Sequence, residues 1–167
     1  GFGHRPGQPR QYDAATGGEI MDKILAFPPL YRPGEHFEYA CWNFLLLGRI
    51  VERLSGRTLA TFCQDEIFTP LGMHDSSMGR PVCNDPQRLA QTENCSAPGQ
   101  ISDFIAKRVF RDGGCAGNAG VFSSAEDLAV FCQCLLNQDR YDNNAKALFS
   151  AEAFAELTTN RMPEGMP

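Results

Sequence analysis

Apolar residues recur every three or four positions in five stretches of the chain, and this spacing predicts five helices. The predicted helices cover about residues 19–27, 41–54, 59–67, 124–135 and 151–158. In the second helix the expected core-facing residues are Phe44, Leu47, Ile50, Val51 and Leu54. In the fourth they are Leu128, Phe131, Cys132 and Leu135.

Residues that start and stop helices support these positions. Gly56 is expected to end the second helix in a left-handed conformation, and Thr58 to cap the start of the third. The sequence Ser-Ser-Ala-Glu at 123–126 is typical of a capping box before the fourth helix. Ser150 is the expected N-cap of the last helix.

Residues 73–122 are rich in Asp, Asn, Pro, Gly and Ser and lack helical periodicity. We predict irregular connections there, with short strands over residues 88–92 and 101–104. The glycine-rich run at 113–120 lacks the order and the Lys-Ser/Thr end of a phosphate-binding loop, so a tight turn is the favoured interpretation. A self-contained domain rarely keeps so long an irregular segment, which indicates a part of a larger fold.

Composition excludes several classes of partner. With 43% hydrophobic and 21% charged residues, the 167-residue chain is typical of a globular protein. A net charge of -5, without any long basic run, argues against nucleic-acid binding. The apolar run at 44–47 is far too short to span a membrane, and we expect no span. No signal peptide is visible.

Seven cysteines, at positions 41, 63, 83, 95, 115, 132 and 134, are an odd number that cannot pair completely within the chain. We favour free thiols over a disulfide framework, which leans weakly towards the cytoplasm. The three histidines are isolated from one another and from cysteines at ligand spacing. We therefore predict neither a metal site nor a cofactor.

The most informative segment is residues 33–48, where a Pro-Gly turn leads through Tyr39 into the second helix. This order would hold a phenol at a helix N-terminus, whose positive dipole end should make the phenol easier to deprotonate. A packing role is the alternative for Tyr39. Cys41 could be a nucleophile at the same helix end, but no histidine is obviously placed beside it, so a packed thiol is favoured.

The motifs around Tyr39 form a long ordered string. Asn43 begins Asn-Phe-Leu-Leu-Leu-Gly, and residues 67–73 read Ile-Phe-Thr-Pro-Leu-Gly-Met. Residues 117–128 read Gly-Asn-Ala-Gly-Val-Phe-Ser-Ser-Ala-Glu-Asp-Leu, and residues 4–9 read His-Arg-Pro-Gly-Gln-Pro. In this order the string resembles the serine beta-lactamase and penicillin-binding-protein-like family, in particular its class C beta-lactamase and esterase branch.

The resemblance implies an α+β fold of which residues 1–167 form a single partial domain, the mostly helical middle. It also implies acyl transfer on a beta-lactam, an ester or a D-alanyl, peptidoglycan-like peptide. In the family a serine of Ser-x-x-Lys is the nucleophile, and the tyrosine matching Tyr39 handles the proton. Cys41, Asn43 and Asn118 take the places of residues that face the substrate.

The sequence departs from the family pattern in three ways. It holds no Ser-x-x-Lys and no Lys-Thr-Gly, Cys41 replaces the usual Asn or Asp, and Asn118 replaces a usual His. We expect that truncation on both sides accounts for the first departure, and that the chain is inactive alone and could self-associate through an exposed apolar face. The alternatives are a non-catalytic relative that binds without turnover and a small helical interaction module.

Overall fold

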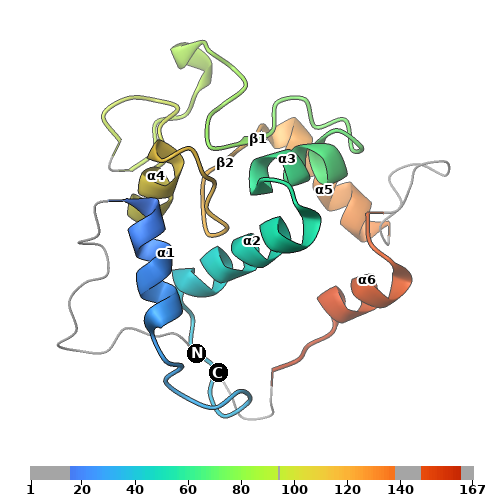
Figure 1. The fold of residues 1–167 in the computed structure, drawn as a ribbon. Helices are drawn as coiled ribbons and strands as arrows, with labels where there is room; N and C mark the ends of the chain where they lie inside the picture. Colours follow the sequence, from blue (N-terminus) through green and yellow to red (C-terminus); the bar gives the residue numbers. More distant parts are fainter. Residues whose placement is uncertain (1–15, 94, 138–147, 163–167) are drawn as a thin grey trace.

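The computed structural model describes residues 16–93, 95–137 and 148–162, and Figure 1 shows their arrangement. The helices are α1 (Gly17–Ala26), α2 (Cys41–Ser55), α3 (Leu59–Cys63), α4 (Phe104–Arg111), α5 (Ala125–Leu136) and α6 (Ala151–Thr158). Strands β1 (Ser77–Met78) and β2 (Val121–Phe122) pair antiparallel, with Ser77 opposite Phe122. The prediction of a mainly helical chain with few short strands is confirmed.

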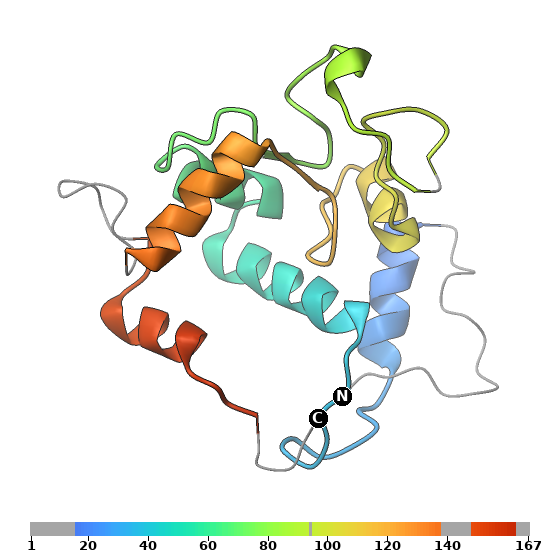
Figure 2. The same ribbon diagram turned by 180° about the vertical axis from the view of Figure 1, so that it is seen from behind.

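Helix α2 lies at the centre of the arrangement. In Figures 1 and 2, α1 and α4 lie beside one end of α2, whereas α3 and α5 lie towards the other end. Helix α1 packs on α4, and α3 contacts both α2 and β1. The helices on the two sides of α2 therefore build two separate cores.

The first core lies between α1, α2 and α4, and the second beneath α3 and α5. The first is formed by Ile20, Ile24, Trp42, Leu45, Ile101, Ile105, Ala106 and Ala116. The second is formed by Phe68, Leu71, Met73 and Cys134.

Helix α1 begins at a capping box formed by Thr16 and Glu19. The Thr16 side chain accepts the backbone N–H of Glu19, and the Glu19 carboxylate accepts the backbone N–H of Thr16. This capping box starts the helix two residues before the predicted position. Ile20 and Ile24, one turn apart, are almost fully buried against α4 and α2.

Helix α2 ends at Gly56 as predicted, with φ of 69° in the left-handed region. Its predicted core face, however, is wrong. The buried residues are Trp42, Leu45 and Gly48. Four of the five residues expected in the core are exposed: Phe44 at 41%, Leu47 at 55%, Ile50 at 51% and Leu54 at 84%. The helix is apolar on two sides, and periodicity alone does not decide which side meets the core.

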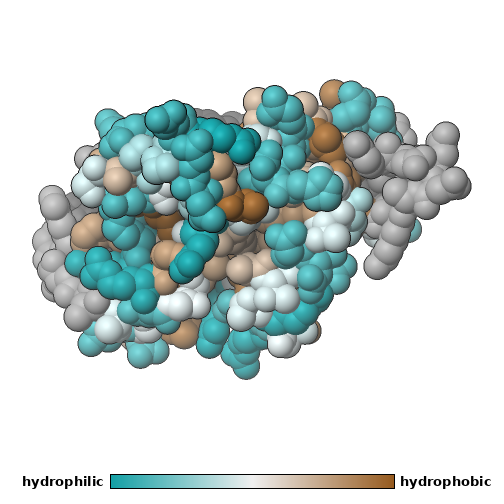
Figure 3. All heavy atoms as spheres, turned by 90° about the horizontal axis from the view of Figure 1, so that it is seen from above, coloured by the Kyte–Doolittle hydropathy of each residue, from teal (hydrophilic) through white to brown (hydrophobic). Residues whose placement is uncertain are grey.

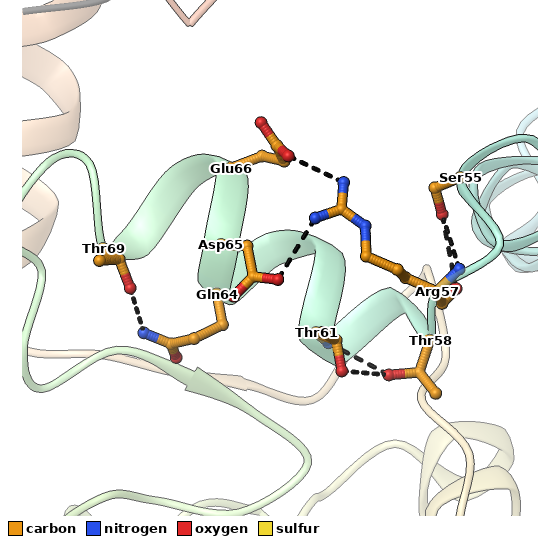
Figure 4. Close-up of polar contacts among 8 residues, drawn as sticks. All are labelled: Ser55, Arg57, Thr58, Thr61, Gln64, Asp65, Glu66 and Thr69. Atoms are coloured by element: carbon orange, nitrogen blue, oxygen red, sulfur yellow. Dashed lines mark hydrogen bonds and ion pairs between the residues drawn. The ribbon is translucent and has the colours of Figure 1, made fainter.

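Helix α3 begins at the predicted cap, where the Thr58 side chain accepts the backbone N–H of Thr61 (Figure 4). The chain then continues as a π-helical turn over Gln64–Phe68. Figure 4 shows the Arg57 guanidinium reaching across to Asp65, at 3.3 Å, and Glu66, at 2.8 Å. These ion pairs are largely exposed, so they add little stability, but they tie the loop after α2 to the π-helical turn.

The strands predicted over residues 88–92 and 101–104 are wrong. Pro86–Arg88 forms a 3-10 turn, and residues 101–103 lead directly into α4. Asp103 caps α4 by accepting the backbone N–H of Ala106 at 2.7 Å. The glycine-rich run is a turn rather than a helix start, as favoured, with Gly113 and Gly120 both at positive φ.

The capping box predicted at residues 123–126 is displaced by one residue, because Ser124 is the N-cap of α5. Asp127 lies in the first turn, and its carboxylate accepts the backbone N–H of Asp75 and the hydroxyl of Ser76. Ser76 and Asp127 are both buried, so this contact anchors α5 to the segment before β1. It also turns Leu128 outward, 50% exposed, and Cys134 inward, whereas Leu128 was expected in the core.

The surface seen from above is mostly hydrophilic, with apolar spheres showing between its two sides (Figure 3). All seven cysteines are free thiols in this structure, and only Cys134 is fully buried. Ser150 caps α6 as predicted. Among the described helices, none is both long enough and apolar enough to cross a bilayer. The His-Arg-Pro-Gly-Gln-Pro segment at 4–9 lies outside the described residues.

Candidate active site

Tyr39 lies where the sequence placed it, in the extended segment that enters α2. Ala40 is the N-cap residue, with φ of -148° and ψ of 138°, and Cys41 is the first helical residue. The Tyr39 side chain is 69% exposed, and its ring lies 5.9 Å from the ring of Phe44, centroid to centroid. The phenol is therefore held beside the helix end on one side and is open to solvent on the other.

The expectation that the helix end would make this phenol more acidic is wrong for this chain. The pKa of Tyr39 is raised above its ordinary value of 10.0, chiefly because a charged Cys41 would repel a phenolate. A hydrogen bond with the Cys41 side chain, slight desolvation and the Asp103 carboxylate act in the same direction. Tyr39 therefore keeps its proton at neutral pH.

Asp103 is a neighbour of Tyr39 that the sequence interpretation missed. It comes from the N-terminus of α4, sixty-four positions further along the chain. An Asp directly before the strongly amphipathic stretch at 104–111 was the available signal, because that pattern is typical of an N-cap. The expectation of a strand at 101–104 concealed it.

Asn43 points back towards the chain that enters the helix. Its Nδ2 donates to the carbonyl of Glu38 at 3.3 Å, and its backbone N–H donates to the carbonyl of Ala40 at 3.1 Å. Ala40 has no side chain that could cap the helix, and the Ala40 carbonyl satisfies the backbone N–H of Asn43 in the first turn. The Asn43 Nδ2 thus fixes the segment that carries Tyr39.

Asn118 lies on the turn between α4 and β2, which packs directly on α2. A Cβ atom added at Gly117 would lie 2.1 Å from the carbonyl oxygen of Phe44, so only glycine allows this approach. The Asn118 Oδ1 atom is buried and accepts no hydrogen bond from any described residue. A buried acceptor without a donor is costly, and a ligand N–H or O–H could satisfy it.

Cys41 is half-buried and pairs with Tyr39 rather than with a histidine. The nearest histidine in sequence, His36, stacks on Tyr31 with the ring centroids 4.3 Å apart. Among the described residues, no histidine is placed to act as the activating base that a cysteine nucleophile uses. Within the described residues, no group of three His, Cys, Asp or Glu side chains could hold a metal ion.

The arrangement can do two things chemically. The exposed Tyr39 hydroxyl can give or take a proton at the entrance of α2, and the buried Asn118 acceptor can receive a hydrogen bond from a bound group. One helix organises both residues, because Tyr39 precedes α2 and the backbone next to Asn118 touches it.

Comparisons with known proteins identify the family of the chain. The Beta-lactamase family model matches residues 2–167. A putative D-alanyl-D-alanine carboxypeptidase of Escherichia coli K12 is 30% identical over 161 residues, covering 86% of this chain and 36% of that protein. An N-acetylmuramyl-L-alanine amidase of Bacillus subtilis is 25% identical over 158 residues, covering 84% and 35%. The chain thus spans about a third of the length of these curated relatives.

Solved structures show the same fold. A penicillin-binding protein from Bacillus halodurans superposes with a TM-score of 0.62 at 20% identity, covering 89% of this chain and 42% of that one. A beta-lactamase/D-alanine carboxypeptidase from Yersinia pestis gives a TM-score of 0.60 at 22% identity, covering 90% and 39%. The helical chain therefore has the fold of part of a beta-lactamase-like α+β domain, and it belongs to the beta-lactamase family.

Proposed function

We propose that this chain supplies the tyrosine wall of an acyl-transfer site in a serine hydrolase that acts on a beta-lactam, an ester or a D-alanyl peptide. Membership of the beta-lactamase family and the relatives named D-alanyl-D-alanine carboxypeptidase support this reaction class. The observation that carries the proposal is the exposed Tyr39 phenol at the entrance of α2, the helix on which the loop of Asn118 also packs.

In this proposal Tyr39 moves the proton between the nucleophile and the leaving group. Its raised pKa makes it a proton donor in this chain, and a role as base requires a cation beside the phenol. The family's lysine of Ser-x-x-Lys would supply that cation from outside these 167 residues. Asn118 would accept a hydrogen bond from the substrate, and Cys41 would line the substrate site next to Tyr39. Asn43 would hold the Tyr39 segment in place through its hydrogen bond to Glu38.

The 167-residue chain alone is expected to be catalytically inactive. None of its serines has a lysine three residues further on, so the nucleophile of the family is not among its residues. A fluorescent penicillin should therefore fail to acylate it. Covalent labelling of any serine in this chain would overturn that part of the proposal.

The test of the site uses the longest reading frame that contains this sequence. Purified protein is assayed with a chromogenic cephalosporin, a p-nitrophenyl ester and a D-alanyl-D-alanine peptide. Tyr39→Phe should lower kcat on the accepted substrate by about a hundredfold or more, because positioned acid–base groups contribute that much. The matched control is Tyr31→Phe, the same change at an exposed tyrosine that stacks on His36, and it should leave kcat unchanged.

A second function is a non-catalytic, binding role for the same fold. Cys41 and Asn118, which replace the family's usual residues, favour it. Binding of a D-alanyl peptide without turnover by the longer protein, weakened by Asn118→Ala but not by Tyr39→Phe, would support this alternative over the enzyme. Hydrolysis that depends on Tyr39 would exclude it.

We further propose that the isolated chain self-associates through the outer face of α2, formed by Phe44, Leu47, Ile50 and Leu54. These side chains are all more than two-fifths exposed on a helix whose other face is already buried. A helix that is apolar on both sides is typical of a fully buried position. A second copy of the same stripe is the simplest apolar cover available to the chain alone.

A further inference from the structure

A cavity of about 300 Å³ lies between β2 and the loop over residues 81–92, which runs above β1 and β2 in Figure 1. This volume is at the lower end of the range for small-molecule sites. The apolar lining includes Val82, Leu89 and Phe122, and the polar lining includes Asp75, Arg88 and Ser123. None of the residues assigned to acyl transfer above lines this cavity.

The loop that forms one wall is held by its own packing. Gly99 has φ of 78°, and a Cβ atom added there would lie 2.9 Å from Leu89 Cδ1 and 3.2 Å from Pro81 Cγ. The two ends of the wall therefore meet over a residue without a side chain. Between them Asp85 caps the 3-10 turn Pro86–Arg88 through its carboxylate. The arginine is thus carried by an ordered turn.

Two opposite charges line the cavity without pairing. Arg88 and Asp75 are both exposed, and neither forms an ion pair with any residue in the part of the chain that the structure describes. A guanidinium is suited to a carboxylate, and a carboxylate is suited to an ammonium group. A ligand that carries one charge of each sign would therefore satisfy both side chains.

The Ser123 hydroxyl is oriented by a buried neighbour. Ser76 is 1% exposed and donates its only hydroxyl proton to Asp127 Oδ2 at 2.7 Å. Ser123 lies 2.7 Å from the Ser76 oxygen, so Ser123 must be the donor in that contact. Its other acceptor, the Ser124 carbonyl, is farther away at 3.4 Å. The Ser123 oxygen is left with free lone pairs, which can accept a hydrogen bond from a ligand.

Asp75 lies on the same side of the cavity as this acceptor. Its backbone N–H donates to Asp127 Oδ2 at 2.9 Å, the oxygen that also accepts the Ser76 hydroxyl. Asp75 and Ser123 are therefore both positioned around one buried carboxylate. Together they form a group of acceptors suited to an ammonium ion, whereas Arg88 comes from the loop.

We propose that this cavity binds a free amino acid with an aliphatic side chain. Arg88 would bind its carboxylate, and Asp75 and Ser123 would bind its ammonium group. The aliphatic group would pack against Leu89 and Phe122. A free amino acid is a small molecule that carries both charges and an apolar group. The binding would not require Tyr39 to act in acyl transfer, so either conclusion can fail without the other.

The test is a titration of the isotope-labelled 167-residue chain with L-leucine and D-leucine, followed by NMR. Saturable shifts are expected at residues 75–92 and 121–124. Two analogues of the better enantiomer serve as matched ligands, because leucinamide lacks the carboxylate and 4-methylpentanoate lacks the ammonium group. Each should bind about tenfold or more weakly than leucine, since each loses one charge-assisted contact. Equal binding of the three compounds, or no saturable shift with either enantiomer, would overturn the proposal.

Two variants assign the charges. Arg88→Gln should bind leucine no better than leucinamide, and Asp75→Asn should bind leucine no better than 4-methylpentanoate. The control is Arg53→Gln, at an exposed arginine on α2 that does not line the cavity, and it should keep both preferences. An Arg88→Gln protein that still prefers leucine to leucinamide would contradict the assigned carboxylate contact.

A cysteine in the cavity provides a readout that needs no variant. Cys83 lines the cavity, whereas Cys132 is exposed on α5 and does not. With leucine at about ten times its dissociation constant, alkylation of Cys83 by iodoacetamide should slow about tenfold, in proportion to the empty sites. Alkylation of Cys132, measured on its own peptide by mass spectrometry, should be unchanged. Equal rates at Cys83 with and without leucine would place any bound leucine elsewhere and refute this site.

Discussion

The two faces of α2 are similar in sequence but different in environment. The inner face buries Trp42, Leu45 and Gly48 against the first core and the turn before β2. The outer face exposes leucines and an isoleucine of the same kind, including Leu47 and Leu54. The difference teaches that hydrophobicity alone did not choose the core side. Gly48 marks that side, because a Cβ atom added there would lie 3.3 Å from the backbone of Gly117, closer than an ordinary contact.

The largest expected effect comes from truncating one leucine on each face. Leu45→Ala, at a residue 3% exposed, should reduce the free energy of unfolding by about 4 kcal/mol through lost burial and a cavity. Leu47→Ala, at a residue 55% exposed, should cost less than about 1 kcal/mol. Urea unfolding followed by circular dichroism measures both. Equal losses would show that the two faces are equally buried in solution.

A methyl group at the contact between helix and turn should be nearly as damaging. Gly117→Ala should cost about 3 kcal/mol, because the new Cβ would lie 2.1 Å from the carbonyl oxygen of Phe44 and the backbone must shift. The control is Gly18→Ala in α1, where the nearest atom would be 4.0 Å away. That change should stabilise the chain slightly, because alanine favours the helix. If the Gly117→Ala protein unfolds at the wild-type urea concentration, the close contact is absent.

The outer face can be tested through association. Leu47→Glu should weaken self-association by about tenfold or more, because it places a charge within the apolar stripe. Leu25→Glu, at a leucine 65% exposed on α1, makes the same change away from the stripe and should leave association unaltered. Sedimentation velocity over a range of concentrations gives the dissociation constants. A wild-type chain that stays monomeric throughout would remove the proposed interface.

The smallest effect concerns the entrance of the helix. Cys41→Ala should lower the pKa of Tyr39 towards the usual 10.0, because Cys41 is the main cause of its rise. The difference in ultraviolet absorbance between each protein and its Tyr39→Phe counterpart reports the titration. An unchanged or higher pKa in the variant would contradict the assigned cause.

The same shift has a consequence for stability. A raised pKa in the folded chain means that the protonated phenol stabilises the fold fully below the unfolded value of about 10. That contribution is lost as the pH rises through the higher folded value. Relative to Tyr39→Phe, wild-type stability should therefore be constant at neutral pH and fall only in the alkaline range.

The sequence predicted helix ends correctly where a single residue determines the local backbone conformation. Gly56, Thr58 and Ser150 end or begin helices as expected, because left-handed geometry and side-chain caps are properties of single residues. The family string likewise placed Tyr39 correctly before α2. Such features depend little on the rest of the fold.

Features that depend on distant partners could not be predicted. The turn that packs on Gly48, at the buried face of α2, lies almost seventy positions away in the chain. Asp127 accepts hydrogen bonds from Asp75 and Ser76, and this long-range contact turns α5 so that Leu128 faces outward. The pKa of Tyr39 depends on Asp103 and on the side-chain pose of Cys41, which spacing along the chain does not encode.

The contact between Gly48 and Gly117 has a consequence for how this site can evolve. Main chain packs directly on main chain there, since a Cβ atom added at Gly117 would lie only 3.2 Å from the Gly48 nitrogen. The relative position of the Tyr39 segment and the Asn118 turn is thus fixed by a joint in which neither residue's side chain takes part. Mutations at positions 41 and 118 can change the chemistry of the site while the contact between Gly48 and Gly117 keeps the Tyr39 segment and the Asn118 turn aligned. The two unusual residues of this chain, Cys41 and Asn118, lie beside this backbone contact and take no part in it.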